Sequence, residues 1–167
     1  MHPEAYAFVQ RVAPPAEGRR VLEIGAYDVN GNPRALFPSA EYVGLDTRPG
    51  PGVDVVADGA TWAGDGRRFD VVVSTETLEH APDPAAILAN ARRRLKVGGL
   101  LIVTLAATSR PPHGIDGGAL GEGETYTRIS RADLAGWLAD WDDVAIEHHP
   151  SRGDLYATAR KPRGGDK

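Results

Sequence analysis

Short apolar runs, separated by turns and by helix-spaced segments, are the main feature of this chain. The runs lie at residues 21–24, 42–45, 53–57, 69–73, 100–105, 143–148 and 155–160. Runs of this length favour strands, and the run at 69–73 is apolar on both faces, as in a central parallel strand. Apolar residues at helical spacing predict helices at 3–12, 84–95 and 130–138, and a brief helical piece is expected between the first two strands. The sequence therefore predicts an α/β fold.

Two boundaries follow from this pattern. We expect Gly98 and Gly99 to end the second helix, because glycine is common just after helix ends. The last two strands are joined by a turn around Pro150 and Gly153, with no helical segment between them. That pair should be antiparallel, because parallel neighbours need a long crossover connection.

The stretch from Arg20 to Asp46 carries the first functional signal. It is a β–loop–α–β unit with an acid at the tip of its second strand, where a carboxylate binds the ribose hydroxyls of a nucleotide. The loop keeps only Gly25, since Tyr27 and Val29 stand where a dinucleotide site would have glycines. An adenosine ligand without a pyrophosphate fits such a loop better, and S-adenosylmethionine is the common one.

Length and composition narrow the class of protein. The 167 residues suggest one domain, here residues 1–161, followed by a disordered tail at 162–167. The net charge of −4 gives no basic surface for nucleic acid, so we expect a small or protein-borne substrate instead of a polynucleotide. The absence of cysteine excludes thiolate zinc sites and cysteine nucleophiles, and no metal site is expected. No membrane span or signal peptide is found, so we expect a cytoplasmic protein.

Further candidate residues follow the later strands. Asp58, with Gly59, follows the third strand and either accepts a hydrogen bond from an adenine amine or solvates a turn. Residues 74–84 follow the fourth strand, where ligand-facing side chains belong in such sheets. Residues 106–127 lack periodicity and form a long loop after a central strand, a position that favours function.

Several segments together resemble the class I S-adenosylmethionine-dependent methyltransferases, within them the small type 11 group. The segments are LEIG at 22–25, GLD at 44–46, VVAD at 55–58, FDVVVSTETLEHAPDP at 69–84, LKVGGLLIVTL at 95–105 and YTRIS at 126–130. The resemblance implies a Rossmann-like three-layer sandwich whose mostly parallel seven-stranded sheet has an antiparallel last strand. It also implies S-adenosyl-L-methionine as cofactor and S-adenosyl-L-homocysteine as product.

The resemblance also implies roles for individual residues. The cofactor-binding residues would be Glu23, Gly25, Tyr27, Asp46, Thr47, Asp58, Gly59 and Ser74. Ser74 would offer a strand-end carbonyl to the cofactor's ammonium group, and His80 matches the family's Glu-His pair at the pocket floor. The chain departs from the family's Gly-x-Gly-x-Gly loop at Tyr27 and Val29. The Tyr27 ring must point away from the ligand, stack on it, or block it.

We expect in-line displacement of the sulfonium methyl by a small-molecule nucleophile, and no general base is needed if the acceptor is a good nucleophile. A poor nucleophile such as an alcohol needs a general base, for which His80 and His113 are the candidates. Each also has an interpretation without catalysis: His80 would only shape the pocket, and His113 would be an exposed loop histidine. Tyr126 and Arg128 either anchor an anionic acceptor or pin the loop to the sheet.

The short N-terminal segment and the lack of insertions suggest an open pocket and a small acceptor from secondary metabolism. Two other functions remain open at this point. A non-catalytic ligand- or protein-binding module follows if Tyr27 blocks the site. A nicotinamide-dependent reductase is disfavoured by the missing glycines of the first loop.

Overall fold

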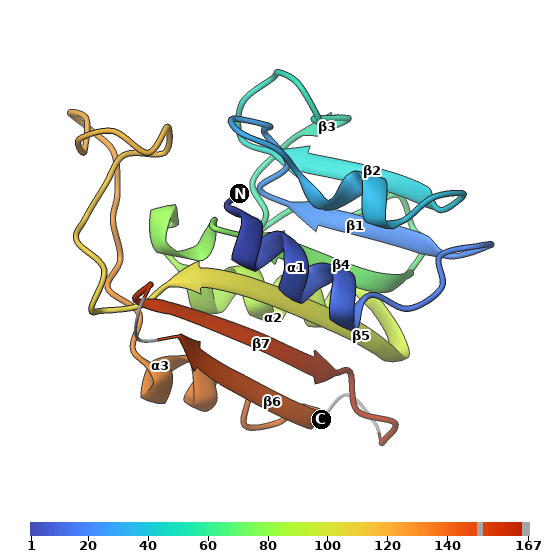
Figure 1. The fold of residues 1–167 in the computed structure, drawn as a ribbon. Helices are drawn as coiled ribbons and strands as arrows, with labels where there is room; N and C mark the ends of the chain where they lie inside the picture. The colour runs from blue at the N-terminus through green and yellow to red at the C-terminus, as the bar shows by residue number, and fades with distance from the viewer. Residues whose placement is uncertain (150–151, 165–167) are drawn as a thin grey trace.

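A seven-stranded sheet forms the centre of the computed structural model, which describes residues 1–149 and 152–164. The strand order is β3-β2-β1-β4-β5-β7-β6 (Figure 1). The strands are β1 (Arg20–Ile24), β2 (Glu41–Asp46), β3 (Val55–Val56), β4 (Phe69–Thr75), β5 (Leu95–Ala106), β6 (Asp142–His149) and β7 (Asp154–Arg160). β7 runs antiparallel to both β5 and β6, whereas the other pairs are parallel. The predicted sheet with a reversed last strand is confirmed.

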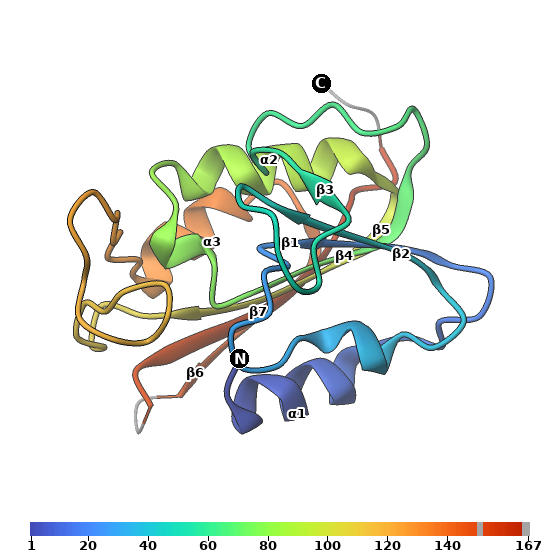
Figure 2. The ribbon, with the colours of Figure 1, turned by 90° about the horizontal axis from the view of Figure 1, so that it is seen from above.

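Helices cover both faces of the sheet (Figure 2). One face carries α1 (Pro3–Val12) and the 3₁₀ helix η1 (Pro33–Leu36), and the other carries α2 (Pro84–Arg94) and α3 (Arg131–Trp137). Successive strand side chains enter opposite cores, so Val21 belongs to the cluster under α1 and Leu22 to the cluster under α2. The predicted three-layer arrangement is therefore confirmed.

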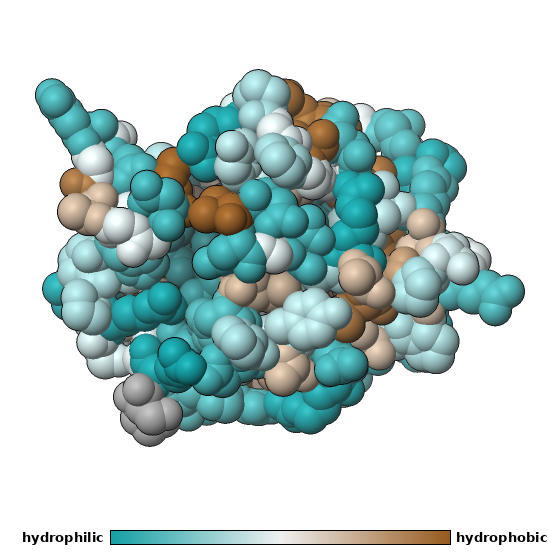
Figure 3. Space-filling model, turned by 45° about the horizontal axis from the view of Figure 1, so that its top comes forward, coloured by the Kyte–Doolittle hydropathy of each residue, from teal (hydrophilic) through white to brown (hydrophobic). Residues whose placement is uncertain are grey.

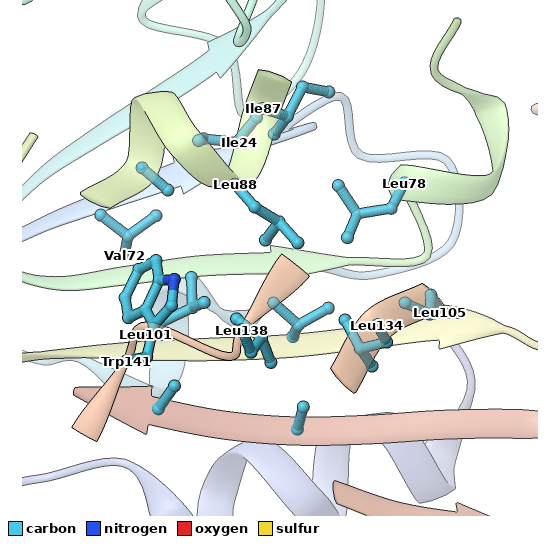
Figure 4. Close-up of a cluster of buried hydrophobic side chains, with 14 of the residues drawn as sticks. Ile24, Val72, Leu78, Ile87, Leu88, Leu101, Leu105, Leu134, Leu138 and Trp141 are labelled. Atoms are coloured by element: carbon cyan, nitrogen blue, oxygen red, sulfur yellow. The ribbon is translucent and has the colours of Figure 1, made fainter. Parts of the chain in front are cut away.

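The larger core lies between the sheet and the helices α2 and α3. Figure 4 shows Leu88 from α2 and Leu134 from α3 gathered with Val72 and Leu101 from the central strands. Burial of each such side chain stabilises the fold by about 1.5–3 kcal/mol. The central strands are thereby a fixed platform for whatever lies at their ends.

The end of α2 differs from the prediction. The helix stops at Arg94, and the chain enters β5 at Leu95 instead of continuing to the glycines. Leu95 is fully buried and pairs with Phe69, after which the register shifts before Leu100 pairs with Val71. Gly98 takes a φ of +73° in that irregular segment, so the glycine serves a bulge in the strand.

The strand β3 is shorter than predicted. Residues 53 and 54 are used by other contacts: the amide of Val53 donates to the carbonyl of Gly50 in a turn. The carboxylate of Asp54 accepts from the amide of Gly44 at 2.7 Å. Only the two residues that follow pair with β2.

The connection between β6 and β7 is tight. The amide of Gly153 donates to the carbonyl of His149 at 2.9 Å, while Pro150 of the predicted turn lies outside the described residues. The same is true of residues 165–167 of the predicted tail. Within the described ranges, no helix has the length and apolar character that crossing a membrane requires.

Candidate active site

The carboxyl ends of β1, β2, β3 and β4 border a cavity of about 630 Å³. This volume lies within the range of about 300–1,000 Å³ that is usual for small-ligand sites. The loop at residues 107–127 supplies the opposite wall and rises beyond the edge of the sheet in Figure 1. Figure 3 shows a mostly hydrophilic surface with separate hydrophobic residues on the face that it presents. Most of the predicted site residues line this cavity.

Gly25 lies where the loops after β1 and β4 touch. Its φ is +84°, and a Cβ atom there would lie 1.9 Å from Oγ1 of Thr77. Only glycine fits both the conformation and the space. Both Gly25 and Thr77 line the cavity, so their close approach sets the floor between the two loops.

Asp46 and Thr47 lie at the end of β2, on the wall of the cavity. The Asp46 carboxylate accepts from the backbone amides of Tyr27 and Arg48, each at 3.1 Å. These two bonds fix the carboxylate between the first loop and the loop after β2. It can still accept further hydrogen bonds from a ligand, because a carboxylate offers about four lone-pair sites.

The Tyr27 ring packs against the loop after β2. A Cβ atom on Gly50 would lie 2.2 Å from Cε2 of this ring, and the Arg48 guanidinium carbon is 4.6 Å from the ring centroid. Tyr27 thus forms part of the wall, held from behind by Gly50 and Arg48, and the cavity remains beside it.

Asp58 and Gly59 follow β3 and also line the cavity. Oδ1 of Asp58 accepts from the amide of Ala60 at 2.8 Å, while the side chain remains exposed. Gly59 is buried, and a Cβ there would lie 2.6 Å from Cγ2 of Ile24. The loop can therefore lie close to β1 only with glycine at this position.

Ser74 is the one predicted cofactor residue that does not reach the cavity wall. It lies within β4 with 1% of its surface exposed, and its hydroxyl has no partner among the described residues. The strand continues to Thr75, whose carbonyl accepts from the hydroxyl of Thr77 at 2.9 Å. Thr75, Glu76 and Thr77 are the residues of this strand end that line the cavity.

Glu23 is buried beneath the first loop and borders the cavity. The hydroxyl of Tyr42 donates to its Oε2 at 2.9 Å. Burial raises the pKa of Glu23 to about 8, because few groups around it stabilise a negative charge.

His80, His113 and Tyr126 form an aromatic cluster at the loop side of the cavity. The two imidazole centroids are 5.1 Å apart, and the Tyr126 ring lies 5.6 Å from His80 and 5.0 Å from His113. Both histidines line the cavity, whereas Tyr126 lies behind them. Burial, followed by the neighbouring His113, lowers the pKa of His80, so its imidazole is neutral at neutral pH.

Arg128 lies away from this cluster. Its side chain is exposed, and Nη1 donates to the carbonyl of Thr108 at 3.0 Å. That bond joins the two ends of the long loop, and Arg128 does not line the cavity.

A group of four side chains that the sequence did not identify lies at the other side of the cavity. Arg110 donates through Nη1 to Glu76 at 2.8 Å and to Asp154 at 3.0 Å, and His2 Nε2 lies 3.1 Å from Asp154. The Asp154 hydrogen bond, followed by Glu76, raises the pKa of His2 to about 10. We call His2, Glu76, Arg110 and Asp154 the charge-balanced cluster, because two cations face two carboxylates.

Sequence reasoning missed this cluster because its members are far apart in the chain. Glu76 has a φ of +50°, which is unusual for a residue other than glycine and which clusters at functional sites. The only sequence signal was its place directly after the central strand. His2 and Asp154 carry no local motif.

Comparisons with known proteins agree with the geometry. A family model described as a methyltransferase domain matches residues 1–156. The chain is 37% identical over 103 residues to a ubiquinone biosynthesis O-methyltransferase of Cereibacter sphaeroides, which covers 53% of this chain and 41% of that protein. It is 31% identical over 153 residues to a protein of the same name from Psychrobacter arcticus, with 88% and 58% covered.

The chain thus spans about half the length of these curated relatives. Among solved structures, phosphoethanolamine N-methyltransferase 2 of Haemonchus contortus, in complex with S-adenosyl-L-methionine, is similar with a TM-score of 0.73. The two are 15% identical, and the match covers 96% of this chain and 52% of that one. At that identity the likeness concerns the fold.

Proposed function

Because the chain belongs to the class I S-adenosylmethionine-dependent methyltransferases, we propose that it transfers a methyl group to a hydroxyl oxygen of a small-molecule acceptor. The observation that carries the oxygen acceptor is the pair His80 and His113 on the cavity wall. An alcohol or phenol is a weak nucleophile until its proton is removed, and a neutral imidazole can remove it. The relatives' name, O-methyltransferase, is in line with this acceptor.

The cavity residues fit the cofactor of this family. Asp46 offers carboxylate oxygens to ribose hydroxyls, and Oε1 of Glu76 is buried at the wall without a hydrogen-bond partner. Such an acid stabilises a cationic ligand group, and the cofactor carries an ammonium and a sulfonium. When bound, S-adenosylmethionine supplies an electrophilic methyl group on its sulfur.

The protein's own contribution is alignment and proton removal. Gly25 and Gly59 let the loops after β1 and β3 pack closely against Thr77 and Ile24 at the cavity wall, and the long loop carries His113 toward His80. Alignment of a bound nucleophile supplies much of the acceleration in such reactions. A small acceptor suits a cavity of about 630 Å³ that must also hold the cofactor. We also propose that the acceptor comes from secondary metabolism.

The test combines a substrate panel with two variants. The protein is incubated with S-adenosylmethionine and matched phenols, alcohols and amines, and methylated products are detected by mass spectrometry. We expect transfer to hydroxyl compounds, lowered about 100-fold by His80→Ala or His113→Ala. Calorimetry with S-adenosylhomocysteine should give nearly unchanged affinity for both variants.

Two results would contradict the proposal. Transfer to amines alone would rule out the oxygen acceptor. Unchanged turnover in both variants would remove the histidines from the reaction. His148→Ala, at an exposed position on β6, is the matched control and should behave as the unaltered protein.

A further inference from the structure

Glu79, His80 and His113 bring three metal-ligating side chains together outside the cofactor-binding loops. One ligand atom of each lies within 4.8 Å of the others. Glu79 and His80 belong to η2 (Leu78–His80), and His113 comes from the long loop. We call this group the histidine cluster.

Two atoms of the histidine cluster lack partners among the described residues. Oε2 of Glu79 and Nδ1 of His80 are buried without a hydrogen bond. The other carboxylate oxygen of Glu79 accepts from the amide of Ala106 at 3.0 Å, which fixes the orientation of the group. A buried polar atom without a partner is costly, so a ligand that bonds to these two atoms would remove that cost.

His113 is oriented by its backbone. Its Nδ1 lies 3.1 Å from the carbonyl oxygen of Pro111, which can only accept a hydrogen bond. Nδ1 is therefore the donor in this contact, and Nε2 is the nitrogen that a metal ion can bind. Metal-binding histidines are commonly held in this way, with the second nitrogen donating to a carbonyl or a carboxylate.

The charge-balanced cluster provides a contrast within the same molecule. His2, Glu76 and Asp154 also have ligand atoms close enough to hold an ion. There Arg110 already binds both carboxylates, and a divalent cation would meet two positive side chains. The histidine cluster has a buried carboxylate and two imidazoles, with no arginine or lysine bonded to Glu79 among the described residues.

We propose that Glu79, His80 and His113 bind a divalent transition-metal ion of the Zn²⁺ or Co²⁺ class, whose open coordination position takes the acceptor's hydroxyl oxygen. Two imidazoles with one carboxylate suit these ions, whereas Mg²⁺ and Ca²⁺ prefer sites made of oxygen atoms. Three protein ligands leave a position for substrate, as in catalytic zinc sites.

The geometry needs a small closure. With metal–ligand distances of about 2.1 Å, tetrahedral ligand atoms lie about 3.4 Å apart. The ligand atoms lie within 4.8 Å of one another, so they must approach by at most about 1.4 Å. Gly114 follows His113, and further glycines follow along the same loop, so its backbone can accommodate the movement.

This inference rests on the proposed O-methyl transfer and revises one step of it: with the ion bound, His80 and His113 hold the metal, and solvent instead of an imidazole takes the hydroxyl proton. The acceptor's O–H bond breaks, its proton passes to solvent, and the oxygen stays bound to the metal as an alkoxide or phenolate. A bound cation favours this ionisation because it stabilises the negative oxygen. The oxygen's electron pair then forms the new bond to the methyl carbon as the bond from that carbon to sulfur breaks.

The test measures Co²⁺ binding to the tag-free full chain, without cofactor or acceptor. We expect one Co²⁺ per chain, with the visible absorption of a tetrahedral site. His113→Ala changes only a loop residue and should weaken binding at least about 10-fold, as should Glu79→Gln. His148→Ala is the matched control and should leave the affinity unchanged. Circular dichroism verifies that each variant is folded.

Binding of S-adenosylhomocysteine is measured on the same samples, so that the two proposals fail separately. Equal Co²⁺ affinity in His113→Ala and His148→Ala, or no Co²⁺ binding at all, would overturn the metal site. Methyl transfer that is unaffected by a chelator would also overturn it while leaving the proposed function intact. Co²⁺ binding as expected, without S-adenosylhomocysteine binding, would remove the proposed function alone.

Discussion

The charge-balanced cluster and the histidine cluster lie at the same edge of the sheet but treat buried carboxylates in opposite ways. In the first, Glu76 and Asp154 share the Nη1 atom of Arg110 at 2.8 and 3.0 Å. In the second, Oε2 of Glu79 has no partner among the described residues. Burial, followed by the charge of Glu76, raises the pKa of Glu79. Arg110 and His2 therefore already supply positive charge to the first cluster, even though Oε1 of Glu76 remains open to the cofactor, whereas Glu79 has no bonded cation among the described residues.

Removing one carboxylate from the charge-balanced cluster should produce the largest loss of stability. Asp154→Asn leaves Arg110 and His2 with less compensation in a place where Asp154 itself is fully buried. Breaking a buried ion pair costs about 3 kcal/mol, which urea unfolding at neutral pH can measure. Asp143→Asn is the matched control, since that side chain is 77% exposed and lies 3.7 Å from Arg160. Equal costs for the two variants would show that the cluster is not structural.

Glu23 is another buried carboxyl group, and its hydrogen-bond partner is the hydroxyl of Tyr42 instead of a cation. Its pKa is about 8 in the folded protein and 4.5 ordinarily, so the folded state holds a proton that the unfolded state loses. Stability should therefore fall as pH rises from about 4.5 to about 8. Glu23→Gln removes this loss and should be about 2 kcal/mol more stable than the unaltered protein at pH 9. The two proteins should be alike at pH 4, and a constant difference across the range would refute the raised pKa.

His2 gives the smallest effect, and here too stability is lost as pH rises, although the substitution is destabilising where Glu23→Gln is stabilising. Its pKa is about 10 in the folded protein and 6.5 ordinarily. Its contribution is fully present below pH 6.5 and is lost as pH rises to about 10. His2→Gln should cost about 1 kcal/mol at pH 6 and almost nothing at pH 10.5, as measured by urea unfolding at both values. His148→Gln, on exposed β6, should show no such change with pH.

The part of the cavity formed by the loops after β1 and β2 was the more predictable half, because local chain geometry determines it. Gly25 and Asp46 are separated by one β–loop–β unit, and periodicity alone indicated that both lie at strand ends. The helix end at Arg94 was missed because the glycines at 98 and 99 serve a strand bulge that forms only through pairing with β4.

The part of the cavity around His80 and His113 depends on contacts between distant segments. The sequence could nominate His80 and His113 singly, but their 5.1 Å ring contact depends on the path of a loop without periodicity. The burial of Glu79 depends on β5 and on Thr127, whose amide donates to the Glu79 carbonyl at 2.6 Å. Such contacts leave no pattern in the order of residues.

The position of the reversed strand β7 constrains the order in which the strands of the sheet can pair. It lies between β5 and β6, although both precede it in the chain. During synthesis, the apolar edge of β5 must therefore wait unpaired until residues 154–160 leave the ribosome. The first residue of β7, Asp154, is also the partner of His2. The strand β7 thus both fills the place between β5 and β6 and binds His2, a residue that precedes every strand of this sheet in the chain.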